Sequence, residues 1–218
     1  MTRMDVFQLR KAIPNEEFDY TLLSSALSEY SGVRQKIHDL MRAGVITRVK
    51  KGLYVFGPEY TRAPICKEVL ANLIFGPSYI SLEYALAFHG VIPERVESIT
   101  SVTPKRDKNF DTPLGRFTYR YLALEKYAMG IEQVWVDRTH PVFMATIEKA
   151  LCDYVVLNKV PLLNEARAAR DFLESDLRID REHWMRFNLI NLRGLNRVYA
   201  NKNIEQILEV LEQERSRI

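Results

Sequence analysis

A basic amphipathic segment followed at once by a short basic hairpin limits the possible folds of this chain more than any other feature. Both lie between Ser31 and Phe56, in the sequence SGVRQKIHDLMRAGVITRVKKGLYVF. Apolar side chains of the segment share one arc of a 3.6-residue helix: Val33, Ile37, Leu40 and Met41. Ser31 is a predicted N-cap, and Gly44 can end the helix in a left-handed conformation. We therefore expect a helix of about thirteen residues with one buried face and one polar, cationic face.

Two strands joined by a turn are predicted directly after this helix. Residues 45–56 are rich in β-branched and aromatic side chains, with a turn in the middle at which Gly52 can adopt a positive φ. Upstream, residues 5–13 and 21–28 have two further short helical patterns. Three helices followed by a two-stranded wing predict a winged helix-turn-helix DNA-binding domain over residues 1–57.

Positive charge is concentrated in the same segment. Residues 31–51 hold six Lys or Arg against one acid, Asp39. Residues 1–64 hold ten basic and seven acidic residues and so carry the whole formal surplus of +3, while the rest of the chain has 21 of each sign. Such a run can be only a solvated helix face, but beside a wing it favours DNA phosphates as partners. Base contacts are assigned to Arg34, Gln35 and Arg42, and phosphate contacts to Arg48, Lys50 and Lys51.

Composition and motifs argue against several other classes of protein. No apolar run approaches the roughly 20 residues that span a bilayer, and the N-terminus has no signal-peptide pattern, so we expect a cytoplasmic protein. Cys66 and Cys152 are isolated and far apart, which predicts reduced thiols and no disulfide or structural zinc. No nucleotide-binding, hydrolase or metalloprotease motif is present, so no enzymatic activity, metal or cofactor is expected. A less favoured alternative is a metal site formed by Asp107, Asp111, Asp137 and His140.

The second unit is predicted to be α+β, with a small, mostly antiparallel sheet followed by several helices. Residues 58–64 are expected to form a linker, because prolines interrupt the periodicity there, and residues 65–218 form the second domain. Expected helices cover residues 65–75, 82–89, 143–158, 164–175, 181–200 (with a break at Gly194 as an alternative) and 204–217. Expected strands cover residues 98–103, 115–122 and 131–136, separated by turn-rich segments such as PKRDKNFDTP.

Four segments, taken in order, resemble successive motifs of the AbiEi family, the antitoxins of abortive-infection type IV toxin–antitoxin systems. The segments are the wing RVKKGLYVFGP, the helix start ISLEYALAFHGVIPE, the strand region ITSVTPKR with TPLGRFTYRYL, and the helix HPVFMATIEKALCDYV. The resemblance covers nearly the whole chain. It implies an N-terminal winged helix that represses its own operon at inverted repeats in double-stranded DNA. It also implies a C-terminal domain that counters a nucleotidyltransferase toxin.

When the family's motifs are matched to this sequence position by position, the resemblance implies particular residues for each of the two activities. Together with those assigned from charge, the DNA-binding residues are Ser31, Arg34, Gln35, Lys36, His38, Arg42, Arg48, Lys50, Lys51, Gly52 and Tyr54. The antitoxin residues that the resemblance implies are Ser81, Glu83, His89, Gly90, Glu148, Lys149 and Asp153. Several of these also have a purely structural explanation. Ser81 can simply cap a helix and Gly90 end it, His89 can interact with a helix dipole, and Lys149 with Asp153 can form a surface ion pair.

One alternative function stays open at this point. A ligand-responsive winged-helix transcription factor without a toxin partner would hold a small-molecule pocket in the sheet of the second domain. Its DNA affinity would change with a metabolite, whereas an antitoxin would rescue growth when co-expressed with its toxin. Whether such a toxin is bound, modified by phosphoryl transfer or opposed indirectly also stays open. The chain is expected to be a monomer or a weak dimer, since an inverted repeat needs two winged helices.

Overall fold

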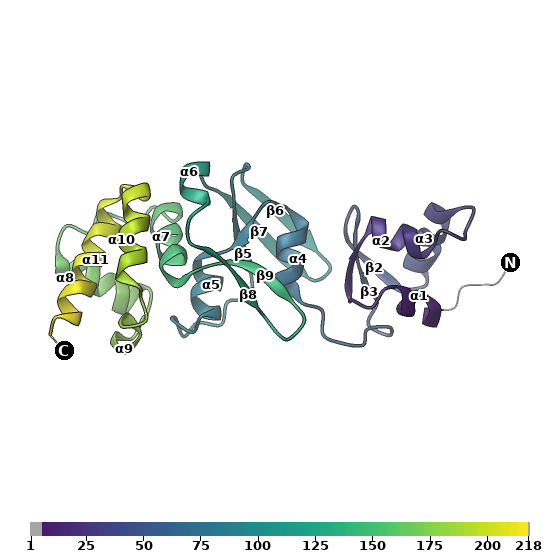
Figure 1. Ribbon diagram of the computed structural model, residues 1–218, viewed down its shortest axis with the longest axis horizontal. Coiled ribbons are helices and arrows are strands. Elements are labelled where there is room, and N and C mark those ends of the chain that lie inside the picture. Colours follow the sequence, from purple (N-terminus) through teal and green to yellow (C-terminus); the bar gives the residue numbers. More distant parts are fainter. Residues whose placement is uncertain (1–5, 218) are drawn as a thin grey trace.

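Three regions follow one another along the computed structural model, which describes residues 6–217 (Figure 1). A small N-terminal unit of helices and a three-stranded antiparallel sheet comes first, a six-stranded mixed sheet lies in the middle, and a group of helices forms the C-terminal end. The chain is therefore a mixed α+β protein, as its sequence predicts. Across residues 6–217, no helix is both long and apolar enough to cross a bilayer.

The N-terminal unit is built from short elements around a core of its own. Its helices are α1 Val6–Ala12, α2 Tyr20–Ala26 and α3 Val33–Arg42, and its strands are β1 Glu17–Asp19, β2 Ile46–Lys50 and β3 Leu53–Phe56. The strands pair in the order β1-β3-β2, and both pairings are antiparallel. The core includes Leu9, Ile13, Phe18, Leu23, Ile37 and Phe56. The sequence does not predict β1, because three residues are too few to show a strand pattern. The predicted helix start at Asp5 lies outside the described residues.

The basic helix differs from the prediction at its start and agrees at its end. Its N-cap is Gly32, which makes no side-chain capping bond, so the prediction that Ser31 is the cap is wrong. As a result α3 has ten residues, not about thirteen. Gly44 (φ +70°) and Gly52 (φ +85°) both adopt the left-handed conformation expected of them. The helix and the hairpin after it are therefore joined as the sequence predicts.

Gly57 closes the N-terminal unit in a place that leaves no room for a side chain. Its N–H donates to the carbonyl of Val45 at 2.9 Å. A Cβ added to Gly57 would stand 1.9 Å from the carbonyl oxygen of Gly44. We therefore expect Gly57→Ala to lower the free energy of unfolding by about 1–3 kcal/mol, as other overpacked sites do. Urea denaturation measures this change.

Gly194 supplies the control for that substitution. It lies inside helix α10 (Leu189–Tyr199), and nothing stands within 4 Å of an added Cβ. Alanine is the better helix former, so Gly194→Ala is expected to leave stability unchanged or to raise it by up to about 1 kcal/mol. Equal losses at Gly57 and Gly194 would contradict the steric explanation.

The central sheet is larger than expected and mixed in direction. Its strands are β4 Tyr79–Ile80, β5 Ile99–Thr103, β6 Lys108–Thr112, β7 Gly115–Tyr121, β8 Ile131–Trp135 and β9 Pro141–Ala145, in the order β6-β7-β5-β4-β9-β8. The pairs β5–β7 and β4–β9 are parallel, and the other three pairs are antiparallel. β6 lies in the segment predicted as a turn. Its sequence does not show a strand pattern, because β6 is an edge strand whose charged residues face solvent. β9 replaces the predicted start of a helix at Phe143.

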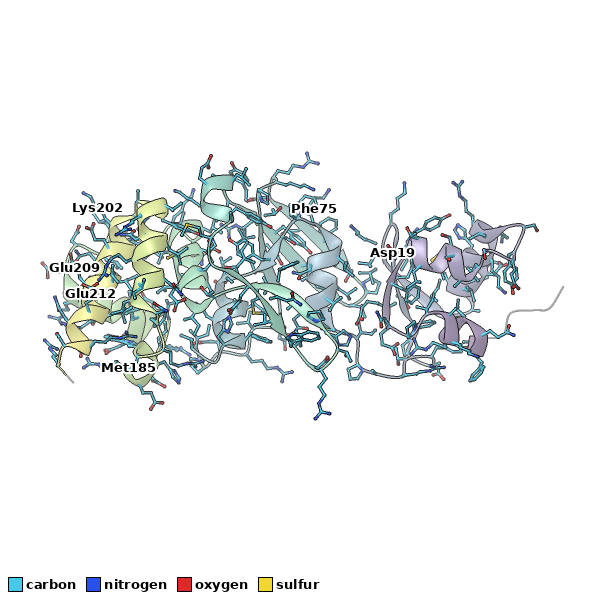
Figure 2. All side chains as sticks on the ribbon, viewed as in Figure 1. Asp19, Phe75, Met185, Lys202, Glu209 and Glu212 are labelled. Carbon is cyan, nitrogen blue, oxygen red and sulfur yellow. The ribbon has the colours of Figure 1, made fainter. Side chains whose placement is uncertain are left out.

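The remaining helices pack against this sheet and against one another. They are α4 Lys67–Ile74, α5 Leu82–Phe88, α6 Leu124–Tyr127, α7 Ile147–Leu157, α8 Ala166–Asp171 with a π-helical continuation over Phe172–Asp176, α9 Arg181–Trp184, α10, and α11 Lys202–Arg215. The break between α9 and α10 falls at residues 185–188, near Met185 in Figure 2, and not at Gly194.

Helix α11 packs within the chain. Its apolar stripe is buried: Ile204, Ile207, Leu208 and Leu211. Its other side carries charged residues, of which Lys202, Glu209 and Glu212 are labelled in Figure 2. The stripe therefore belongs to the large core of the C-terminal region and is not a free face for a coiled coil.

The hairpin of the N-terminal unit also contacts the larger unit. Val49, Leu53 and Val55 belong to the large core, together with residues of α4 and the central sheet. The backbone N–H of Cys66 donates to the Glu17 carboxylate at 2.5 Å. Burial of that carboxylate raises the pKa of Glu17. The two units are thus joined by packed side chains as well as by the connecting segment.

Candidate nucleic-acid interface and a buried polar network

A groove of about 710 Å³ opens between α3, the β2–β3 hairpin and the start of α2. It is lined by Tyr20, Arg34, Ile37, His38, Met41, Arg48, Lys51, Gly52 and Tyr54. The apolar members form part of its wall, while Arg34, His38, Arg48 and Lys51 are exposed. No lining residue is acidic. The groove therefore combines apolar walls with uncompensated positive charge, an arrangement that attracts an anionic polymer.

Local backbone geometry explains which cations reach the groove. The pairing register shifts between Arg48 and Lys50, which marks a β-bulge at Val49. After the bulge, Val49 packs in the large core, and the Lys50 ammonium donates to the carbonyl of Ile74 at the end of α4. Arg48, before the bulge, and Lys51, in the turn, stay on the groove side. A bulge thus re-aims successive side chains of one strand.

Lys50 is consequently placed differently from the prediction. Burial lowers its pKa, and the nearby positive charges of Lys105 and Lys108 lower it further. Its partner, the Ile74 carbonyl, lies at a helix C-terminus, where a cation interacts favourably with the helix dipole. The assignment of Lys50 as a phosphate contact is therefore revised. In the structure this side chain joins the N-terminal unit to α4.

The other predicted DNA-binding residues lie outside the groove lining. Gln35 donates to Asp39 at 3.1 Å, one turn further along α3. The Lys36 ammonium stands 4.9 Å from the centre of the Tyr30 ring. Ser31 and Arg42 are exposed near the two ends of α3. Tyr20, Ile37 and Met41 also line the groove but are not among the predicted DNA-binding residues, because none of them carries a charge.

A second cluster of polar side chains lies deep inside the C-terminal region. Asp153 is at its centre: one carboxylate oxygen accepts from Tyr79 at 2.8 Å and from Ser81 at 2.7 Å. The other accepts from Tyr199 and lies 3.2 Å from the Lys149 ammonium. These residues come from β4, the position after it, α7 and the end of α10. The cluster therefore connects the sheet to two helices.

Burial and hydrogen bonding are complete around this ion pair. Lys149 and Asp153 have 0 % exposed side chains. The Lys149 ammonium also donates to the Lys126 carbonyl and to Tyr199, so its three donors are all used. Burial lowers the pKa of Lys149, and the Asp153 charge opposes that shift. Burial, followed by the Asp153 charge, raises the pKa of Tyr79 and of Tyr199, so both hydroxyls stay protonated and donate.

Three of the predicted antitoxin residues are thus brought together, but inside the protein. Ser81 occupies the N-cap position of α5, yet its hydroxyl makes no capping bond and donates to Asp153. Lys149 and Asp153 form a buried pair, so the alternative of a surface ion pair is wrong. A surface position fails for this pair because α7 is buried on most of its circumference, with every residue from Glu148 to Asp153 buried. These side chains are therefore buried and bonded to one another, and are not exposed at the surface.

The other predicted antitoxin residues are spread over the same region. Glu148 is buried and accepts from the backbone N–H of Asn188 at 2.6 Å, next to the start of α10. The His89 ring bonds the Ala145 carbonyl at 2.8 Å, and Gly90 follows it with a positive φ of 64°. Glu83 accepts from the Asn158 side chain at 3.2 Å. Of this set, Glu83 and His89 are partly exposed.

The residues of the alternative metal site do not gather. Asp107 and Asp111 lie beside or in β6, at one edge of the sheet, where Asp107 accepts from the Tyr121 N–H and Asp111 faces Arg116. The Asp137 and His140 side chains bond each other at 2.7 Å in the turn between β8 and β9, at the opposite edge. Residues 6–217 contain no group of three His, Cys, Asp or Glu side chains placed to hold a metal ion.

Both cysteines are free, as predicted, and both are buried. Burial raises the pKa of the Cys66 thiol to about 12, and burial also raises the pKa of Cys152 well above its usual value. A thiol with a raised pKa carries little thiolate at neutral pH and is a poor nucleophile.

A second groove, of about 510 Å³, lies between α4 and strands β8 and β9. Its lining is mainly apolar and includes Leu73, Tyr79, Tyr127 and Phe143. Ser78 also lines it; the Ser78 hydroxyl is buried and has no hydrogen-bond partner among residues 6–217. No sequence pattern pointed to this groove.

Comparisons with known proteins add no family name to this geometry. No family model matches the chain, and no curated protein is similar to it.

Proposed function

We propose that the N-terminal unit is a winged helix-turn-helix that binds double-stranded DNA through the groove between α3 and the β2–β3 hairpin. The observation that carries the proposal is the set of exposed cations in that groove, with no acid among its lining residues. Ten residues of helix span about 15 Å, and a helix fits the roughly 12 Å width of the major groove.

In this arrangement the two parts of the groove have different tasks. Arg34 and His38 lie one turn apart on α3 and line the groove, so they are the candidates for base contacts. Arg48 and Lys51 on the hairpin contact phosphates, which fixes the position of α3 without reading the sequence. Lys36 and Arg42 also lie on α3, outside the groove lining, and extend the cationic surface.

We further propose that the chain is an antitoxin of the AbiEi type, which represses its own operon and neutralises a nucleotidyltransferase toxin through its C-terminal region. The four motif segments support this proposal. In the structure, ISLEYALAFHG and IEKALCDYV, far apart in the sequence, pack together as α5 and α7 and share the Ser81–Asp153 hydrogen bond. The motifs therefore belong to one structural unit.

Growth rescue tests the antitoxin proposal. Co-expression with the nucleotidyltransferase encoded beside its gene is expected to restore growth for the natural chain and for the Arg48→Glu, Lys51→Glu variant. Repression of a promoter reporter is expected to fail only in that variant, because the groove and the C-terminal region are separate surfaces. Loss of rescue in the folded variant, or no rescue by the natural chain, would count against the proposal.

The second groove favours one alternative, a ligand-responsive transcription factor. A small molecule bound between α4 and β9 would meet the unpartnered Ser78 hydroxyl. Any shift of α4 would reach the hairpin through the Ile74–Lys50 contact. This alternative requires a DNA affinity that changes with a metabolite and no dependence on a toxin, so the same rescue experiment separates it from the antitoxin proposal.

A further inference from the structure

Strand β8 lies at one edge of the central sheet. β8 ends the sheet order β6-β7-β5-β4-β9-β8, so within residues 6–217 its one neighbouring strand is β9 (Figure 1). The Thr146 N–H donates to the Gly130 carbonyl, and the Val136 N–H donates to the His140 carbonyl. Hydrogen-bonded and non-hydrogen-bonded pairs alternate along an antiparallel ladder. The backbone N–H and C=O groups of residues 132 and 134 therefore bond β9, whereas those of residues 131, 133 and 135 point away from β9.

The hydrogen bonds of the Asn72 side chain, on the other side of β9, are consistent with this alternation. Phe143 stands opposite Gln133, in a pair that makes no mutual backbone bond. Its N–H and carbonyl instead contact the Asn72 amide, at 2.7 and 3.3 Å. The backbone groups of Ile131, Gln133 and Trp135 have no such cover and bond nothing among residues 6–217. β8 thus presents three unpaired residues in register.

This edge lacks the features that usually prevent pairing with another strand. The sequence IEQVW contains no proline or lysine, and its one charge, Glu132, lies on the opposite face from the outward-bonding residues. Trp135 is 59 % exposed, and Phe143 on the same face of the sheet is 55 % exposed. An exposed edge strand beside exposed aromatic rings is an association site.

The edge is complementary to itself. In an antiparallel pair of two β8 strands centred on Gln133, Ile131 of each copy stands opposite Trp135 of the other. An aromatic and a β-branched side chain make a favourable cross-strand pair. The two Gln133 residues face each other on the two-fold axis, and each Glu132 faces Val134. No like charges are opposed, and every free N–H and carbonyl of the three outward residues gains a partner.

We propose that β8 pairs antiparallel with β8 of a second copy of this chain, which joins two central sheets into one across a two-fold axis. The edge length of five residues and the self-matching register favour a second copy over a strand of different sequence. The proposal does not depend on DNA binding or on a toxin. In such a dimer, two N-terminal units would belong to one particle.

Charge at the two-fold position tests the proposal. Gln133 is exposed, and its backbone makes no bond within the sheet, so Gln133→Lys and Gln133→Glu are expected to fold normally. Each variant alone places like charges opposite each other and is expected to weaken dimerisation about fivefold or more. An equimolar mixture of the two variants opposes Lys to Glu and is expected to restore the dimer. Sedimentation velocity over a concentration series measures all three samples.

Gln133→Thr is the matched control, because it keeps the backbone and adds no charge; its dimer is expected to match that of the natural chain. The proposal is overturned if the natural chain stays monomeric at every concentration up to the millimolar range. It is also overturned if the two charged variants dimerise as the control does, or if mixing them restores nothing. If the natural chain is monomeric and its Gln133→Lys variant no longer binds a partner protein, the β8 edge binds that partner, and the proposal is likewise overturned.

Discussion

Replacing both Arg48 and Lys51 with glutamate is expected to weaken binding to duplex DNA about 100-fold, which corresponds to about 3 kcal/mol. These two cations lie on the hairpin side of the groove, and each is exposed and free of an acidic partner among the lining residues. Two phosphate contacts would be lost and two repulsions introduced. Fluorescence anisotropy with a labelled duplex from upstream of the gene measures the affinity.

A matched double variant distinguishes the effect of the groove cations from the effect of the protein's net charge. Arg116→Glu with Arg167→Glu changes the formal charge by the same amount, at exposed positions on β7 and α8. This control is expected to lose only a few-fold in affinity, through the general field of the protein. Equal losses in the two double variants would mean that the groove is not the DNA-binding surface. Circular dichroism spectra of both variants check that they remain folded.

Replacing Asp153 with alanine is expected to lower the free energy of unfolding by about 3–5 kcal/mol. The substitution would leave the Lys149 ammonium fully buried without a counter-charge. It would also leave the hydroxyls of Tyr79, Ser81 and Tyr199 without their acceptor. Urea denaturation of the full chain, followed by circular dichroism, measures the change.

A paired substitution shows whether the buried charge is the cause. Asp153→Leu with Lys149→Met removes both charges and keeps apolar volume, so it is expected to cost less than Asp153→Ala alone. If Asp153→Ala proves too unstable to purify, the double variant and Asp153→Asn still give the comparison. A loss below about 1 kcal/mol for Asp153→Ala, the size typical of surface ion pairs, would contradict the explanation.

The N-terminal unit was largely predictable because its signals are local. The apolar arc of α3, the left-handed glycines at 44 and 52 and the β-branched hairpin depend on residues close together in the sequence. Arg34, Arg48 and Lys51 line the groove for the same reason. Lys50 could not be placed from sequence, because its orientation depends on a bulge and on a carbonyl 24 residues away in α4.

The C-terminal region was less predictable because its determinants are far apart in the chain. β9 was predicted as helix, since an apolar run before a helix has the same composition as the helix itself; the strand is defined by pairing with β8 and β4. The alternative of a surface ion pair for Lys149 and Asp153 fails for a similar reason. Its burial depends on Tyr79 and Tyr199, which stand 74 and 46 residues from Asp153.

The salt dependence of DNA binding tests the proposal that the cations of the α3–hairpin groove bind DNA phosphates. The logarithm of the binding constant is measured against the logarithm of salt concentration for the natural chain and for Arg48→Glu, Lys51→Glu. Each lost phosphate contact lowers the slope by about 0.9. We predict a steep slope for the natural chain and one shallower by about 2 for the variant. Identical slopes, or no duplex binding by the natural chain at low salt, would contradict this proposal.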